Sequence, residues 1–420
     1  MSNFDVAMGL SEQALNQISD GFYARSKDTV YMGTVEAAGM TIAWAALSAP
    51  EFSLSPPPLE TARHVVATCD VEGKYPHLLA TAAERPDLVD GVALVMATST
   101  NGFSFTIAQL QLSFGSTAQL TVPLVARGCI VNANNATSMK LLGVSVTVDG
   151  PVNQKIVNDF LVPRLTTVLA EMLSSFQIPP LAIANLNVGA TNAAVVGKAI
   201  VIFGNLAGNT AAPSIDGFSL PPTDFFALLG PNAVQAQVNS AVGGKTFGPS
   251  GSVSIGIGDA DYHATVTINN PQASLAGNGL SINLGLVGSA GAGISVGCVH
   301  PSAGFDVYAQ PNPTVSCSLT VSGSSIAVRA QSCSPFGVNV KATGVAIILE
   351  PFIGPIASAI GSAVTAAFSS QIISLASFPS IDVPSMPVHD SGRSMTVLPT
   401  NVGVGGDAGY LSITGQIAIS

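Results

Sequence analysis

The amino-acid sequence predicts an α+β fold of two tandem modules, each a long helix wrapped by a curved antiparallel sheet. Two long segments repeat apolar residues at steps of three and four, which is the spacing of a helix with one buried face. Many shorter segments, such as FSFTIAQLQLSF and SVSIGIG, alternate apolar and polar residues, which is typical of half-buried antiparallel strands. The same order of elements occurs twice along the chain.

The two long helices each follow an apolar strand and a proline. We expect the first at about Val152–Phe176 and the second at about Phe352–Leu375. They share a landmark, because FLVP ends at Pro163 and FIGP ends at Pro355. A helix of about 24 residues is about 36 Å long at the usual rise per residue, far longer than the usual three turns.

A short helix opens each half of the chain. AMGLSEQALNQISDGFY predicts the first, with Ser11 as its N-cap, and ALLGPNAVQAQVNSAV from Ala227 predicts the second. A proline-rich exit follows each long helix, and NVG then begins at Asn187 and at Asn401, each before a closing strand. Several landmarks in the same order indicate a duplicated ancestral unit.

The repeat also predicts where the modules begin and end. We expect a first module at 1–206, a linker at 207–220 and a second module at 221–420. The linker sequence is rich in glycine, proline and serine, which favours a connection over a further helix or strand.

The second long helix lies in a segment without charge between Glu350 and Asp382, long enough to cross a bilayer. Its counterpart in the first half carries four charged residues, and a charge at mid-membrane is costly. Those residues are Lys155, Asp159, Arg164 and Glu171. Because duplicated helices should have equivalent surroundings, we expect the second helix to pack on its own sheet, with at most peripheral membrane contact.

Composition excludes one class of partner. Only 9% of residues are charged and the formal net charge is −10, whereas nucleic-acid binding requires clustered basic residues. The 14 basic residues form no run that would hold the chain to anionic lipid.

The start of the chain and its cysteines bear on location. MSNFDVAMGL has no basic segment before an apolar one, so we expect a cytoplasmic protein or one exported without a Sec signal peptide. The five cysteines include no CxxC pair, which fits a reducing compartment. A disulfide between Cys317 and Cys333 across a hairpin stays open.

Small residues on the second long helix indicate a ligand. Side chains of this size leave volume between helix and sheet, and a dry apolar cavity binds apolar ligands. These residues are Ala357, Ala359, Gly361, Ala363, Ala366 and Ala367. An acyl chain gains about 0.8 kcal/mol per buried methylene, so we expect a lipid or fatty acyl ligand, bound without catalysis, cofactor or metal.

The residues expected to bind this ligand are the large apolar side chains of the four helices. They are Leu15, Ile18, Phe22, Phe160, Leu165, Leu169, Met172, Phe176, Val234, Val238, Ile356, Ile360, Val364, Phe368 and Ile372.

Three sequence motifs bear on whether the protein is an enzyme or holds a phosphate or a metal. GISVG from Gly293 matches the GxSxG pattern of hydrolases, but no helix follows it. GGKT from Gly243 lacks the leading glycine of a phosphate loop. DADYH places Asp259, Asp261 and His263 on one side of a strand, where they could hold a metal, although a solvated turn is the simpler interpretation.

The long helices, the IPPLAI-type exits and the NVG closing strands together resemble the tubular lipid-binding (TULIP) superfamily. This superfamily includes bactericidal permeability-increasing protein, cholesteryl-ester-transfer protein and accessory proteins of clostridial neurotoxin clusters. The resemblance covers the whole chain as order and length of elements, and it implies two end-to-end modules with an apolar groove for lipid tails. The absent signal sequence makes the bacterial toxin-accessory members the closer comparison.

A second function stays open beside lipid binding. A structural or complex-forming accessory protein, alone or as a homo-oligomer, would have the same fold with its core filled by its own side chains. A hydrolase at GISVG or a metal enzyme at DADYH is the third alternative.

Overall fold

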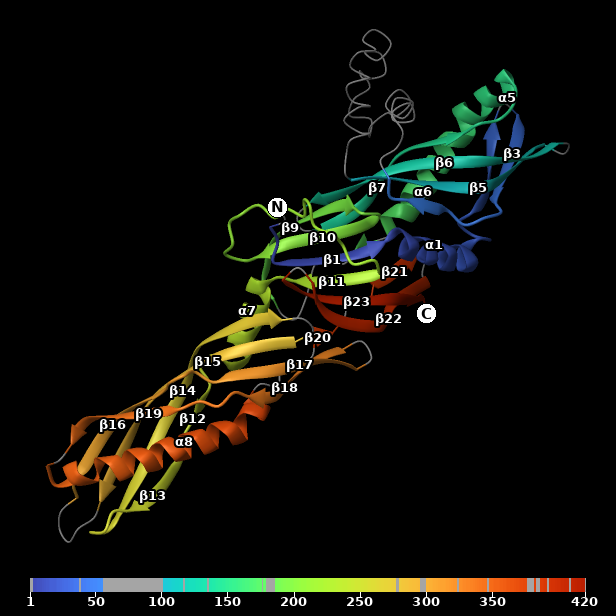
Figure 1. Cartoon of the computed structure of the whole chain (residues 1–420). Coiled ribbons are helices and arrows are strands. Elements are labelled where there is room, and N and C mark those ends of the chain that lie inside the picture. Colours follow the sequence, from blue (N-terminus) through green and yellow to red (C-terminus); the bar gives the residue numbers. More distant parts are fainter. Residues whose placement is uncertain are drawn as a thin grey trace.

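The structure is a computed structural model. It describes residues 3–37, 39–55, 101–115, 118–133, 136–175, 177–178, 186–276, 279–294, 300–322, 325–345, 347–375, 381–382, 386–390, 393–407 and 409–419. Three sheets form an elongated body in which the central sheet lies between the other two (Figure 1). Every strand pairing within these residues is antiparallel. The α+β class with curled antiparallel sheets is therefore confirmed.

The first half of the chain contains ten described strands and two short or broken helices. They are β1 (Val6–Ser11), α1 (Glu12–Ser26), β2 (Met32–Ala37), β3 (Met40–Ala46), β4 (Glu51–Ser53), β5 (Gly102–Phe114), β6 (Ala118–Ala133), β7 (Ala136–Val146), α5 (Pro151–Ile156), the π-helical η1 (Val157–Leu161), α6 (Val162–Ser175), β8 (Gln177–Ile178), β9 (Val188–Val196) and β10 (Ala199–Leu206).

The second half has the remaining elements. They are β11 (Phe225–Leu229), α7 (Pro231–Val242), β12 (Thr246–Phe247), β13 (Ser250–Ser254), β14 (Asp259–Ala276), β15 (Gly279–Ile294), β16 (Ser302–Ala309), β17 (Thr314–Ser322), β18 (Ser325–Cys333), β19 (Val338–Val345), the 3-10 helix η2 (Ile347–Phe352), α8 (Ile353–Leu375), β20 (Ile381–Asp382), β21 (Met386–Asp390), β22 (Arg393–Asp407) and β23 (Tyr410–Ile419).

The helical segments form where the sequence predicts them, with one irregularity. Ser11 caps α1 as expected, because its side chain accepts a hydrogen bond from the Ala14 N–H at 3.1 Å. The first long helix is continuous over 151–175 but contains the π-helical turn η1, in which the Val162 N–H bonds the Val157 carbonyl. Pro163 follows at once. Since proline has no N–H and crowds the carbonyl four residues earlier, a wider turn at this point relieves that conflict.

In each half the long helical segment touches strands from distant places in its sheet. In the first half the sheet order is β2-β3-β5-β6-β7-β8, and η1 contacts β2 while α6 contacts β7. In the second half α8 contacts β13 and β14 and also β18 and β19. A helix can reach strands so far apart in the order only if the sheet curls around it.

The central sheet joins the two halves of the chain. Its order is β21-β22-β23-β11-β1-β10-β9, so β1 pairs with β10 of its own half and with β11 of the other. Gly9 on β1 lies opposite Phe226 on β11, and a Cβ at Gly9 would meet the Phe226 ring at 2.2 Å. Only glycine lets this ring lie across β1.

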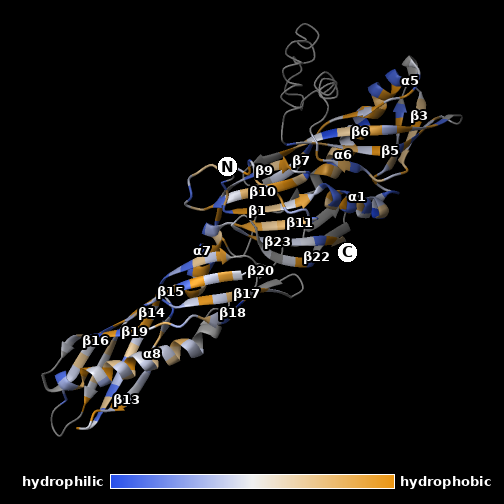
Figure 2. Cartoon of the chain, viewed as in Figure 1, coloured by the Kyte–Doolittle hydropathy of each residue, from blue (hydrophilic) through white to orange (hydrophobic). Residues whose placement is uncertain are grey.

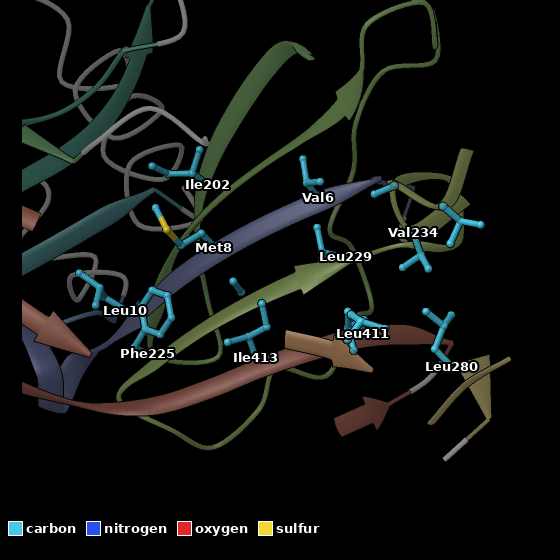
Figure 3. Packing of buried hydrophobic residues seen from close by; sticks show 14 of the residues in the cluster. Val6, Met8, Leu10, Ile202, Phe225, Leu229, Val234, Leu280, Leu411 and Ile413 are labelled. Atoms are coloured by element: carbon cyan, nitrogen blue, oxygen red, sulfur yellow. The ribbon is translucent and has the colours of Figure 1, made fainter. Parts of the chain in front are cut away.

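Both faces of the central sheet are covered. One face carries Val6, Met8 and Leu10 into the main core, as Figure 3 shows. The other face is covered by 207–220, the segment expected to be a linker, because Ile215 and Phe218 pack on the sheet there. The Phe218 ring meets the Phe4 ring edge-on at 5.2 Å. This connection is therefore packed against both halves.

Asp5 is a buried carboxylate at the junction of the halves. It is 4% exposed. Its Oδ2 accepts hydrogen bonds from the Leu206 N–H at 2.9 Å and from Asn209 Nδ2 at 3.1 Å. Its Oδ1 accepts one from Asn232 Nδ2, in the first turn of α7, at 2.8 Å. One side chain thus ties β1 to the connection and to the first helix of the second half.

We predict that Asp5→Ala lowers the free energy of unfolding by about 3 kcal/mol, because three charge-assisted hydrogen bonds to a buried carboxylate are lost. Urea unfolding followed by circular dichroism measures this change. The matched control is Asp216→Ala, since Asp216 is exposed and accepts a hydrogen bond from Ser214 Oγ; its effect should stay below about 0.5 kcal/mol. Equal effects of the two variants would contradict the role assigned to Asp5.

Candidate functional site

The inner face of α8 is a row of four large side chains. Ile356, Ile360, Val364 and Phe368 follow at steps of four and are each 0% exposed. They belong to the same apolar cluster as side chains of the surrounding sheet. A side chain without accessible surface has protein on every side and no adjacent space for a water molecule. The interior at these positions is therefore packed with the protein's own atoms.

The first half brings the predicted residues of α1 and α6 into one core. Leu15, Ile18 and Phe22 are at most 6% exposed, and Leu165, Leu169 and Met172 are at most 4% exposed. Tyr31 links the two sets: its hydroxyl lies 3.1 Å from the Met172 sulfur and its ring meets the Phe22 ring edge-on at 6.1 Å.

The predicted residues of α7 are buried as well. Val234 and Val238 are 5% and 1% exposed. Figure 3 shows Val234 close to Leu280 and Leu229, at the junction with the central sheet. These side chains hold α7 in place.

Three predicted residues stand apart from this core. Phe160 is 38% exposed and does not line the interior, contrary to expectation. It lies in the π-helical turn, which changes the direction of its side chain relative to a regular helix. Ile372 lies on α8, but its side chain is outside the described residues, as is the whole of Phe176.

The small residues of α8 do not enlarge an interior tube as the sequence analysis expected. Ala366 is exposed, and the other alanines are half-buried on the sides of the helix. Gly361 is buried where the helix approaches β19, since a Cβ there would lie 3.5 Å from the Val338 carbonyl oxygen. The small residues of α8 thus allow the helix to approach β19 closely, and they form the outer surface of the helix.

The outer surface of α8 is uncharged and largely uncovered, with serine, glycine, proline and alanine at its exposed positions. Residues 350–370 have a mean hydropathy of 1.5, and only 22% of that window is buried. By length and composition alone this is a helix that could cross a membrane. In Figure 2, α1 and α5 show hydrophilic stretches of blue, which differ from the charge-free sequence of α8.

A groove of about 540 Å³ runs along this outer surface, beside the start of β19. Among the described residues, those that line it have small, hydroxyl-bearing or aromatic side chains, and none of them is charged. The lining residues are Phe336, Gly337, Val338, Ala357, Ser358, Gly361, Ser362, Thr365, Ala366 and Ser369. The Thr365 hydroxyl already donates to the Gly361 carbonyl at 2.9 Å. The volume of the groove lies in the range of small-molecule sites.

Three aromatic rings lead from this groove into the core. Phe336, half-buried in the loop before β19, meets Phe368 edge-on with ring centroids 5.2 Å apart. Phe368 in turn lies 5.8 Å from the ring of Phe247. Phe336 therefore separates the groove from the packed interior.

A groove on the outer surface of α8 was not predicted from the sequence. Its wall combines α8 with Phe336, which precedes the helix by a whole strand and the 3-10 helix η2. The exposed positions Ser358, Ser362 and Ala366 follow at steps of four, a signal that is present in the sequence, and of these three only Ala366 was interpreted as leaving interior volume.

No arrangement of side chains in the described part of the chain supports the catalytic or metal alternatives. Asp259, Asp261 and His263 lie along β14, each opposite a serine of β13. Among the described residues no group of three His, Cys, Asp or Glu side chains could hold a metal. Ser295 of GISVG lies outside the described residues, and GGKT follows α7 and leads into β12.

The described cysteines are free thiols. Cys317 is opposite Ala330 while Cys333 is opposite Val315, so the two cysteines are not a directly facing pair. Burial raises the pKa of Cys317 to about 11 and also raises the pKa of Cys333. Cys69 and Cys298 lie outside the described residues.

Comparisons with known proteins give likenesses of fold. No protein-family model and no curated protein matches the chain. The structure is similar to P47 of Clostridium botulinum E1, with 8% identity and a TM-score of 0.45 over 99% of this chain and 100% of that chain. It is also similar to P47 from Clostridium botulinum A2, with 11% identity and a TM-score of 0.45 over 98% and 97% of the chains. A lipopolysaccharide binding protein matches with 10% identity and a TM-score of 0.38 over 99% of both chains.

We predict that iodoacetamide at pH 8 alkylates Cys333 well before Cys317. Thiolate is the reacting form, and the pKa of about 11 keeps Cys317 protonated. The rate at Cys317 should rise about tenfold per pH unit up to about pH 11, as measured by peptide mass spectrometry. The urea-unfolded chain is the control, in which both thiols should react alike. Equal rates at both cysteines in the folded protein would contradict the packing of Cys317.

Proposed function

We propose that this protein binds an uncharged, chain-like apolar group, such as the acyl tail of a lipid, without catalysis. The proposed site is the groove outside α8 in the second half. The expected site between helix and sheet is less favourable, because the row from Ile356 to Phe368 has no accessible surface. Entry of a ligand there would require the core to separate.

The observation that carries the proposal is the lining of the groove. It has no charge, it offers Ala366 and Val338 as apolar contacts, and it offers Ser358 and Ser362 as hydroxyl groups. An acyl chain loses no hydrogen bond on entering such a site, and the hydroxyls can bond an ester or a carboxyl group. A charged headgroup finds no counter-charge among the described lining residues, so the carboxylate of a fatty acid would stay in solvent while its chain lies in the groove.

We also propose that two equivalent modules, 1–206 and 221–420, arose by duplication. The order of the central sheet supports this, because β10 and then β9 flank β1 just as β23 and then β22 flank β11. In both cases the flanking strands are the last of their half, and a helix directly follows β1 and β11. The proposed groove lies in the second module.

We predict that Ala366→Trp weakens binding of a fluorescent polyene fatty acid by about tenfold or more, because the indole occupies the groove. Titration of the delipidated protein, with displacement by palmitate, measures the affinity. The matched control is Gly354→Trp on the same helix, at an exposed position where an added Cβ meets nothing within 4 Å. Its affinity should stay within about twofold of the wild type. Unchanged binding in both variants would overturn the groove as the site.

The second candidate is a complex-forming role. It is favoured by the 22% burial of the apolar window over 350–370, which leaves a helix face for a protein partner or a second copy. Under this alternative, the delipidated chain should form oligomers in light scattering that Ser362→Arg dissociates. A monomer at all concentrations would argue against self-association through this face.

A further inference from the structure

We infer that Phe336 sets the length of chain that the groove accepts. This inference rests on the proposed function and concerns one wall of the same site. Phe336 lines the groove and also packs edge-on against Phe368, with ring centroids 5.2 Å apart. No other residue in the described lining contacts the aromatic rings of the core in this way.

Phe336 is the residue of the described lining whose ring packs on a ring of the core, so shortening its side chain opens the groove toward the interior. Gly361 has no side chain to shorten, and it lies where α8 approaches Val338. Removal of the Phe336 ring would extend the groove down to Phe368, which is 0% exposed in the intact protein. The new floor would again be apolar, so the added space suits methylene groups.

The chemistry of the ligand follows from this arrangement. Each methylene that fits in the groove should tighten binding about fourfold. A methylene that the Phe336 ring keeps from entering the groove should add little to the affinity, because it stays in water. The affinity of straight-chain fatty acids should therefore rise with length and then level off at a chain length fixed by Phe336.

The test is competition of saturated fatty acids, from octanoate to stearate, against the fluorescent polyene fatty acid. In Phe336→Ala the levelling point should move to longer chains, and stearate should bind about tenfold tighter, the gain of one to two further methylenes. Phe336→Trp should move the levelling point to shorter chains.

The matched control is Phe218→Ala. Phe218 is also a half-buried ring packed edge-on against another phenylalanine at 5.2 Å, but it covers the central sheet. Loss of this ring should leave the levelling point unchanged. If Phe336→Ala does not fold, Phe336→Leu gives the same direction with a smaller shift, and Phe336→Trp tests the opposite one.

The outcomes separate the two proposals. A wild-type protein that binds none of the fatty acids overturns the proposed function. A wild-type protein that binds them, with the same levelling point in every folded Phe336 variant, overturns only the role of Phe336. A shift shared by Phe218→Ala would also overturn it, because the effect would then come from general destabilisation.

Discussion

The burial of one narrow row of side chains on α8 determines the rest of the second half. Ile356, Ile360, Val364 and Phe368 fix the helix inside the curled sheet, and each contributes about 2 kcal/mol by leaving water. This row is only one residue wide, since its neighbours in sequence are alanine, glycine, serine, threonine and proline. The helix therefore packs tightly on one side and presents small side chains on the other. The groove outside α8 is a direct consequence, because small side chains cannot fill the space beside β19.

The pairing of β1 with β11 has the same importance for the whole chain. Because backbone hydrogen bonds continue from one half into the other, the two halves share a sheet and do not merely touch. The connection at 207–220 covers the outer face of that sheet, and the Asp5 carboxylate secures its start. An elongated body with α8 on one side of the central sheet follows from this arrangement (Figure 1).

The sequence predicted much of the fold, but it did not indicate the groove outside α8. The α8 periodicity, the Ser11 cap and the strand alternation were sufficient for the elements, because each of these signals is local. The direction of the small residues was predicted wrongly, since a helix rich in alanine, serine and glycine has almost no contrast between its faces. Phe160 was misplaced because periodicity assumes a regular helix, and Pro163 replaces one turn of it by a π-helical turn.

Long-range contacts account for the remaining differences. The partners of Asp5 follow it by about 200 residues, and no local pattern indicates that they meet. Phe336 belongs to a loop whose sequence, SPFG, indicates a turn and nothing more. It becomes part of the groove only because β19 brings it beside α8.

The central claim is that a ligand lies outside α8 and not between helix and sheet. Photolabelling with a fatty acid that carries a diazirine at its far end, followed by residue-level mass spectrometry, tests this claim most directly. We expect the label on Phe336 and on outward residues such as Ser362 and Ala366. Label on Ile360, or on Phe22 and Met172 in the core of the first half, would contradict the account.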